Sequence, residues 1–125
     1  MHIKKILFVE DDDTLAFIIS KKLEHLGFFV TLSRDGEDAI TKLKVQNDFD
    51  IVISDNILPF FSGIEILKFL RQDLNSETPF ILVSLDSSLY LKETFYKYGG
   101  TTFLKKPFVF NTLLEELNAI NPKLI

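Results

Sequence analysis

The stretch ILFVEDDD, residues 6–13, decides the fold of this chain. Its first four residues form an unbroken apolar run, which is typical of a β-strand buried on both faces of a parallel sheet. Four acidic residues follow directly, and over residues 14–26 the apolar residues recur with the period of a helix. They form one stripe that we expect to face the core: Leu15, Ile18, Ile19, Leu23 and Leu26. Asp13 is placed to cap this helix and Gly27 to end it. The stretch therefore predicts a strand, an acidic turn and a helix in succession.

The same alternation of strand and helix patterns continues along the rest of the chain. Short runs rich in β-branched and aromatic residues indicate strands, and segments of helical period separate them. We predict an α/β fold of the (βα)5 type, a doubly wound, flavodoxin-like sheet of five parallel strands in the order 2-1-3-4-5, with helices on both faces. The expected strands are 5–9, 28–32, 51–54, 80–83 and 102–105, and the expected helices are 14–26, 37–46, 64–74, 88–98 and 111–120.

Length and composition limit what the chain can be. With 125 residues, of which 46% are hydrophobic, we expect one domain over residues 1–125, with a core from about 4 to 120 and no output domain. The absence of cysteine excludes disulfides and thiolate chemistry, and His2 and His25 lack metal-ligand companions. No stretch approaches the ~18 apolar residues that span a membrane. Eighteen acidic against 14 basic residues leave no basic stripe for nucleic acid. We therefore expect a cytoplasmic protein that binds neither membranes nor nucleic acid directly.

Polar side chains follow the predicted strands at one edge of the sheet. Glu10 and Asp11 follow the first strand, Asp55 the third, Ser84 the fourth and Lys106 the fifth. Ligands of such folds bind beyond the carboxyl ends of the strands, where three carboxylates repel one another unless a hard dication such as Mg²⁺ joins them. The lysine adds a point charge and the serine a hydroxyl donor. These are the parts of a phosphoryl-transfer site whose nucleophile is the Asp55 carboxylate.

From Ile6 to about Ile120 the chain resembles the receiver domain of two-component response regulators. Four motifs carry the resemblance, in the family's order and at about its spacing: ILFVEDD, IVISDNILPFFSG, PFILVS and FLKKPF. Each motif alone is weak, because acidic loops and Lys-Pro dipeptides are common. Four of them at the right strand ends form a specific signal.

The resemblance implies a phosphoacceptor site with a bound metal ion. Asp55 matches the phosphorylated aspartate, and Glu10 and Asp11 match the acidic pair, with Asp11 the more direct Mg²⁺ ligand. The backbone carbonyl of Ile57 would also ligate the metal, for which Mn²⁺ could substitute. The implied donor is a phosphohistidine of a histidine kinase or of a histidine phosphotransfer protein. The implied activity is that of a signalling switch in a phosphorelay, which is not a turnover enzyme.

Further positions match the family's switch and rate-tuning residues. Ser84 matches the hydroxyl residue that binds the new phosphoryl group, and Phe103 matches the aromatic switch position. Lys106–Pro107 matches the family's lysine and its cis peptide bond, while Ile57 and Asp86 match positions that set the lifetime of the phosphoryl group. Phosphorylation would change the face formed by the last two expected helices and the strand between them, for a downstream protein partner that the sequence does not name. The protein would be a monomer or a phosphorylation-linked dimer.

Four residues depart from the family's pattern. Phe103 replaces the commoner Tyr, and Leu85 stands where a small residue is usual, so that its bulk is expected to narrow access to Asp55. Phe60 occupies a position that is more often small or polar. Val109 replaces a capping residue, which predicts that the last helix starts late, at Asn111.

Three alternatives from other classes are weighed against the receiver. A small phosphatase of the haloacid-dehalogenase type shares an Asp after an apolar strand, but Leu15 misses the last position of the signature that Asp11 and Asp13 begin, and no later acidic pair follows. A flavodoxin-type FMN binder shares the fold, but the acidic turn would repel a phosphate. A pseudo-receiver that only docks partners keeps the fold without phosphorylation, and Leu85 is its best support.

Overall fold

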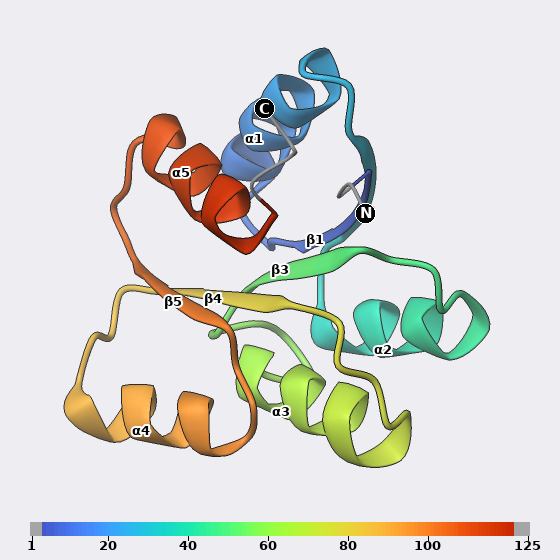
Figure 1. The fold of residues 1–125 in the computed structure, drawn as a ribbon, viewed down its shortest axis with the longest axis vertical. Coiled ribbons are helices and arrows are strands. Elements are labelled where there is room, and N and C mark those ends of the chain that lie inside the picture. The colour runs from blue at the N-terminus through green and yellow to red at the C-terminus, as the bar shows by residue number, and fades with distance from the viewer. Residues whose placement is uncertain (1–3, 122–125) are drawn as a thin grey trace.

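The structure is a computed structural model that describes residues 4–121. The ends of the predicted domain, 1–3 and 122–125, lie outside the described residues, as does His2. Strands and helices alternate along the whole described part, as Figure 1 shows. The elements are β1 (Lys5–Val9), α1 (Asp13–His25), β2 (Phe29–Ser33), α2 (Gly36–Val45), β3 (Ile51–Asp55), α3 (Gly63–Lys68), the π-helix η1 (Phe69–Asp73), β4 (Phe80–Ser84), α4 (Leu89–Lys97), β5 (Thr102–Lys105) and α5 (Phe110–Ile120).

The five strands form one parallel sheet in the order β2-β1-β3-β4-β5, which confirms the predicted topology. In the register, Val9 of β1 lies between Ser33 of β2 and Ser54 of β3, and Ser84 of β4 lies opposite Lys105 of β5. Because every strand runs in the same direction, all the carboxyl ends meet at one edge of the sheet. Residues that follow different strands are thereby brought within reach of one another.

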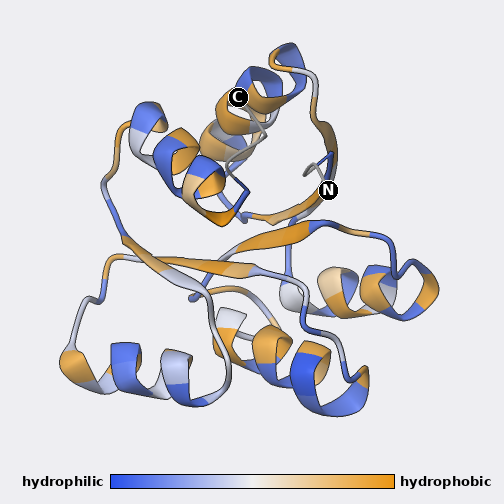
Figure 2. Ribbon diagram, viewed as in Figure 1, coloured by the Kyte–Doolittle hydropathy of each residue, from blue (hydrophilic) through white to orange (hydrophobic). Residues whose placement is uncertain are grey.

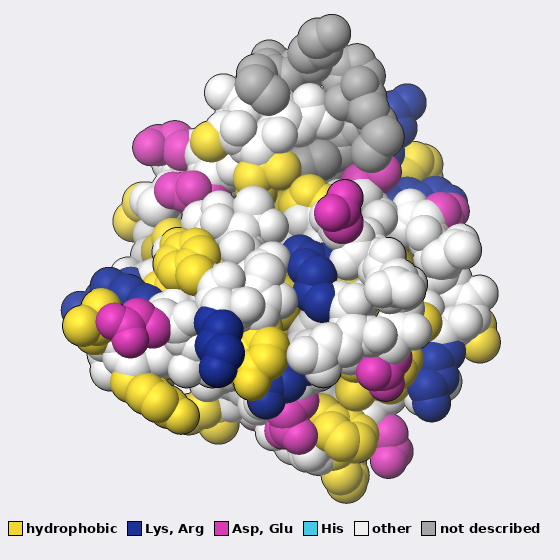
Figure 3. All heavy atoms as spheres, turned by 60° about the horizontal axis from the view of Figure 1, so that its bottom comes forward, with side chains coloured by type: hydrophobic (Ala, Val, Ile, Leu, Met, Phe, Trp, Pro, Cys, Tyr) yellow, Lys and Arg dark blue, Asp and Glu magenta, His cyan; other side chains and the backbone are white. Residues whose placement is uncertain are grey.

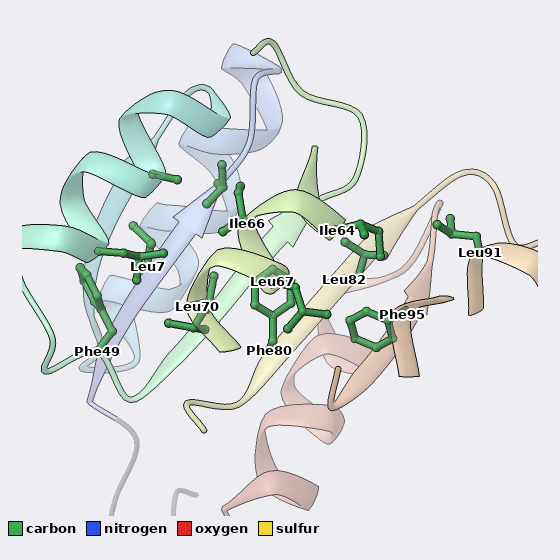
Figure 4. Packing of buried hydrophobic residues seen from close by; sticks show 14 residues of the cluster. Leu7, Phe49, Ile64, Ile66, Leu67, Leu70, Phe80, Leu82, Leu91 and Phe95 are labelled. Carbon is green, nitrogen blue, oxygen red and sulfur yellow. The ribbon is translucent and has the colours of Figure 1, made fainter. Parts of the chain in front are cut away.

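Helices cover both faces of the sheet. Helices α1 and α5 lie on one face and α2, α3 and α4 on the other (Figure 1). Alternate strand residues serve the two layers, so that Ile6 packs toward α1 and α5 while its neighbour Leu7 packs toward α2 and α3. Figure 2 shows the hydrophobic strands sandwiched between helices that turn polar residues outward. Figure 4 shows part of the core between the sheet and the helices α2, α3 and α4, in which Phe80 and Phe95 are fully buried.

The first helix differs from the prediction at its start and in its buried stripe. Asp12, not Asp13, is the N-cap, because its backbone is extended and its carboxylate accepts the Leu15 N–H at 2.9 Å. The helix buries Ala16, Ile19 and Leu23 against the sheet. The predicted stripe also included three residues that are 37–54% exposed, namely Leu15, Ile18 and Leu26.

Several other elements also differ from their predicted bounds: β2, α2 and α4 by one residue at each end, and α3 and α5 as follows. The segment predicted as one helix over 64–74 is α-helical only to Lys68 and continues as the π-helix η1. Arg71 in η1 donates to the carbonyls of Gly99 and Ser76, and so ties this segment to the turn after α4. Helix α5 begins at Phe110, one residue before the predicted start, and its N-cap Val109 makes no side-chain cap hydrogen bond.

Two glycines allow loops to touch the backbone near the carboxyl edge. A Cβ at Gly63 would overlap the carbonyl oxygen of Asp55, and a Cβ at Gly36 would overlap the backbone of Phe61. The Gly36 N–H donates to the Pro59 carbonyl at 3.1 Å. The β3–α3 loop is therefore held against the start of α2 by direct backbone contact.

The outer surface mixes apolar and charged side chains. On the face shown in Figure 3, hydrophobic side chains form separate islands among charged ones. Within residues 4–121, no helix combines the length and the hydrophobicity that crossing a membrane requires.

Candidate functional site

The carboxyl edge of the sheet brings together the residues that the sequence singles out. Asp55 and Ser84 are the last residues of β3 and β4, and Glu10 and Lys106 come directly after β1 and β5. Backbone hydrogen bonds extend the ladders past the strand ends, since the Glu10 N–H donates to Ser33 at 3.0 Å and the Lys106 N–H donates to Ser84 at 2.9 Å. The side chains are thus placed by the sheet itself rather than by free loops.

Three carboxylates form a tight cluster at this edge. One oxygen from each of Glu10, Asp11 and Asp55 lies within 4.8 Å of the other two. Glu10 is 2% and Asp55 is 5% exposed, whereas Asp11 stands at the surface. The cluster therefore has a buried base and an open side. Hard oxygen donors in this arrangement fit a small dication such as Mg²⁺.

Lys106 neutralises part of the cluster. Its Nζ lies 2.8 Å from Asp55 Oδ1 and 3.2 Å from Glu10 Oε1, and its side chain is 18% exposed. The Lys106–Pro107 peptide bond is cis, as the resemblance implied. One ammonium thus serves two buried carboxylates, which leaves an excess of negative charge at the base of the site.

The protonation of Asp55 reflects this imbalance. Burial and the adjacent Glu10 carboxyl raise the pKa of Asp55 from its ordinary value of 3.8 to about 8, against the opposing effect of Lys106. Burial by itself lowers the pKa of Lys106, but the hydrogen bond and charge of Asp55 together with Glu10 outweigh it, so the pKa of Lys106 is raised. The ammonium is therefore retained while the carboxyl is reluctant to ionise.

We expect the stability of the metal-free protein to fall as the pH rises from about 4 to about 8. The raised pKa means that the folded chain holds the Asp55 proton more tightly than the unfolded chain, so this stabilisation is present in acid and is lost as the pH passes the folded pKa. The Lys106 shift lies above this window and stays constant within it. Asp55→Asn removes the effect, so its free energy of unfolding should exceed that of the wild type by an amount that grows with pH up to about pH 8.

Urea unfolding of both proteins in EDTA at several pH values measures this difference. Because both proteins share every other titrating group, the difference isolates the cluster around Asp55. A gap between the two proteins that shrinks as the pH rises would contradict the expected repulsion.

The two predicted switch residues lie in different surroundings, and only Ser84 lines the cavity with the cluster. Ser84 is 4% exposed, and its hydroxyl makes none of the hydrogen bonds found among residues 4–121. Phe103 is partly buried on the α4 side of β5, edge to face with the ring of Phe95 at 6.0 Å between centroids. The Lys92 ammonium lies 5.7 Å from the Phe103 ring centre. Phe103 therefore packs toward α4 and has no hydroxyl to donate a hydrogen bond.

The two predicted rate-tuning residues are placed differently. Ile57 is 77% exposed and lines the open side of the site. The Asp86 carboxylate is not part of that lining and accepts the Ser88 N–H at 2.8 Å. Leu85 also lines the site and is 72% exposed.

An open cavity of about 630 Å³ lies over the cluster. Its polar part is lined by Asp55, Lys106 and the three acidic residues Glu10, Asp11 and Asp12, and it continues as an apolar groove between α1 and α5. The groove was not predicted, because the apolar α1 residues were assigned to the core. The side chains that line the groove include Leu15, Ile18, Phe108 and Phe110.

Arg34 is a residue of this region that the sequence reasoning did not connect with the site. Its Nε donates to the Glu10 carbonyl at 2.9 Å and one terminal nitrogen donates to the Asp11 carbonyl at 2.6 Å. Its other terminal nitrogen forms an ion pair with Asp13. The available signal was its place directly after β2, the strand that neighbours β1.

Comparison with known proteins agrees with this architecture. The family model of the response regulator receiver domain matches residues 6–118. The receiver domain of the Francisella response regulator 1452 superposes with a TM-score of 0.86 at 32% identity, covering 96% of this chain and 98% of that one. Vibrio cholerae chemotaxis protein CheY4 gives a TM-score of 0.86 at 30% identity, covering 94% and 98%.

A longer relative matches over the same region. The response regulator ArlR of Staphylococcus saprophyticus is 35% identical over 116 residues, which cover 93% of this chain and 51% of that protein. The chain thus spans about half the length of this curated relative. Receiver domains generally bind Mg²⁺ at an acidic pocket, and the cluster of Glu10, Asp11 and Asp55 provides such a pocket here.

A parallel sheet in the order 2-1-3-4-5, an acidic pocket at its carboxyl edge and a family match over nearly the whole described chain agree with one another. The chain belongs to the response regulator receiver domain family.

Proposed function

We propose that this receiver accepts a phosphoryl group on Asp55 from a phosphohistidine, carried by a histidine kinase or a histidine phosphotransfer protein. One observation carries the proposal: Asp55 lies on the floor of an open cavity, 2.8 Å from the Lys106 ammonium and within 4.8 Å of two other carboxylates. A nucleophilic carboxylate, a fixed cation and ligands for a dication are what phosphoryl transfer requires.

The transfer exchanges one bond to phosphorus for another. An Asp55 carboxylate oxygen attacks phosphorus in line, the new O–P bond forms, and the N–P bond to the donor imidazole breaks with its electron pair going to the nitrogen. Lys106 is placed to stabilise the oxygens of the transferring group. Mg²⁺, held by Asp11, Asp55 and the Ile57 carbonyl with Glu10 beside them, would neutralise charge on those oxygens.

The phosphoryl group would then bias the conformation of the opposite helical face. The Ser84 hydroxyl is available to bind a phosphoryl oxygen, and its movement toward that oxygen opens space into which Phe103 turns. The face of α4, β5 and α5 changes shape for a downstream partner. A nearly complete shift between two states requires a preference on the order of 5 kcal/mol. Hydrolysis of the acyl phosphate resets the switch, at a rate for which we propose Ile57 and Asp86 as tuning residues.

The docking-only alternative rests on the bulk of Leu85. This residue is 72% exposed and lines the same open cavity as Asp55, which supports phosphorylation over docking alone.

A trapping experiment tests the proposal. The protein is incubated with acetyl phosphate and Mg²⁺, the acyl phosphate is reduced with borohydride, and the modified peptide is sequenced by mass spectrometry. We expect modification at Asp55 in Mg²⁺ and none in EDTA. Modification of a different carboxylate, or no modification with Mg²⁺ present, contradicts the proposal. Purified phosphohistidine donors then serve as the second arm of the experiment.

A further inference from the structure

Arg34 lies where two loops of the site meet. It follows β2, whose last residue Ser33 pairs with Val9, so its side chain lies beside the turn that leaves β1. Its guanidinium group donates to two consecutive carbonyls, those of Glu10 and Asp11. These are the residues whose side chains form two of the three members of the carboxylate cluster.

The guanidinium fork fixes the orientation of this backbone. Two donors in one rigid plane, each on a different carbonyl, restrain the rotation of the peptide units that carry Glu10 and Asp11. Glu10 is then directed toward Lys106, and Asp11 toward Asp55. The ion pair with the exposed Asp13 uses the remaining terminal nitrogen of Arg34 and takes no part in these two carbonyl hydrogen bonds.

The turn that carries Arg34 also touches the loop after Asp55. Gly36 donates to the Pro59 carbonyl at 3.1 Å, and its missing side chain lets it contact the backbone of Phe61. The β2–α2 turn therefore contacts both loops that surround the metal-ligand cluster. A displacement of this turn would therefore shift both the β1–α1 loop and the β3–α3 loop.

We propose that Arg34 is a positioning residue that sets the affinity of the site for a divalent cation by holding the Glu10–Asp11 backbone. The inference rests on the proposed function, since it takes the cluster to be a metal site. Charge and geometry act in opposite directions here. The positive charge of Arg34 by itself weakens the binding of a cation, whereas the ordering of the carboxylates strengthens it. The sign of the effect therefore shows which contribution dominates.

Mg²⁺ titration of Arg34→Lys and Arg34→Ala tests the proposal, with the dissociation constant measured by calorimetry and by amide chemical shifts. Lysine keeps the charge but cannot span two carbonyls with one plane of donors. We expect both variants to bind Mg²⁺ about tenfold more weakly than the wild type. We also expect faster amide hydrogen exchange in residues 10–13 of the metal-free variants, a result that needs no bound metal.

Two control variants separate positioning from general damage. Asp13→Ala removes the ion pair of Arg34 but leaves both carbonyl hydrogen bonds, so its Mg²⁺ affinity should stay close to that of the wild type. Arg71→Lys disrupts a similar fork, on the carbonyls of Gly99 and Ser76, at the opposite edge of the sheet. It should lower thermal stability without changing the Mg²⁺ affinity.

The outcomes are distinguishable. Wild-type affinity in Arg34→Lys, or tighter binding in Arg34→Ala, overturns the positioning role because charge alone then governs the site. Equal weakening in Arg71→Lys also overturns it, because loss of stability would explain the effect. If the wild type itself does not bind Mg²⁺, the proposed function is contradicted, and so is the inference that depends on it.

Discussion

Asp55→Asn will not accept a phosphoryl group from acetyl phosphate, at any Mg²⁺ concentration. The side chain is 5% exposed and nearly isosteric with asparagine, so the fold should be retained while the nucleophilic carboxylate is replaced by a carboxamide. The Glu10 and Asp11 carboxylates remain in the cavity, but in the proposed site they pair with Lys106 and hold the metal ion rather than attack phosphorus. Intact-protein mass spectrometry after incubation with acetyl phosphate measures the expected complete loss of the covalent adduct.

The matched control is Asp12→Asn, which makes the same chemical change at the neighbouring turn. Asp12 is exposed and acts as the N-cap of α1, a role that asparagine fills equally well. This variant should be modified at the rate of the wild type. Undiminished adduct formation in Asp55→Asn would instead place the acceptor on another residue and remove the basis of the proposed function.

Replacing Lys106 with methionine should impair both chemistry and stability. Methionine keeps the unbranched apolar stem but removes the ammonium that lies 2.8 Å from Asp55 and 3.2 Å from Glu10. Loss of one positioned cation from the transfer site should slow phosphorylation by a factor on the order of 10²–10³. In the metal-free protein at pH 8, the buried Glu10 carboxylate and the partly ionised Asp55 carboxyl lose the ammonium that lies between them, so the free energy of unfolding should fall by about 3 kcal/mol.

Stopped-flow kinetics and urea unfolding measure these two effects separately. Lys105→Met is the control, since Lys105 is the preceding residue and its side chain is exposed. That variant should match the wild type in both assays. A Lys106→Met protein that is phosphorylated at the wild-type rate would show that the ammonium has no part in the transfer.

The arrangement of the fold could be predicted because its determinants are periodic and local. The continuous apolar runs of the strands and the helical spacing between them recur five times, and the rule for parallel crossovers leaves few topologies. The position of the cluster follows from the same rule, because residues such as Asp55 and Lys106 end up at one edge whatever the details of the loops. Strand ends therefore carry more information about the site than any single motif.

Features that depend on the geometry of a turn were not predictable in this way. The choice of Asp12 over Asp13 as the cap of α1 is decided by which residue keeps an extended backbone, and both residue types suit the role. The change to a π-helix after Lys68 leaves the apolar pattern unaltered. The contacts of Arg34 require two turns from different strands to meet, which no spacing along the chain records.

The hydrogen bonds from Arg71 to the Gly99 carbonyl limit which part of α4 can move after a phosphoryl group binds near Ser84. The guanidinium anchors the turn just after the last residues of α4, whereas Leu91 is the one buried residue of the helix's first turn. A helix that is held at its carboxyl end moves most at its amino end. Any reorientation of this helix is therefore largest around Leu89 and Tyr90, whose side chains are 70% and 79% exposed and so accessible to a binding protein.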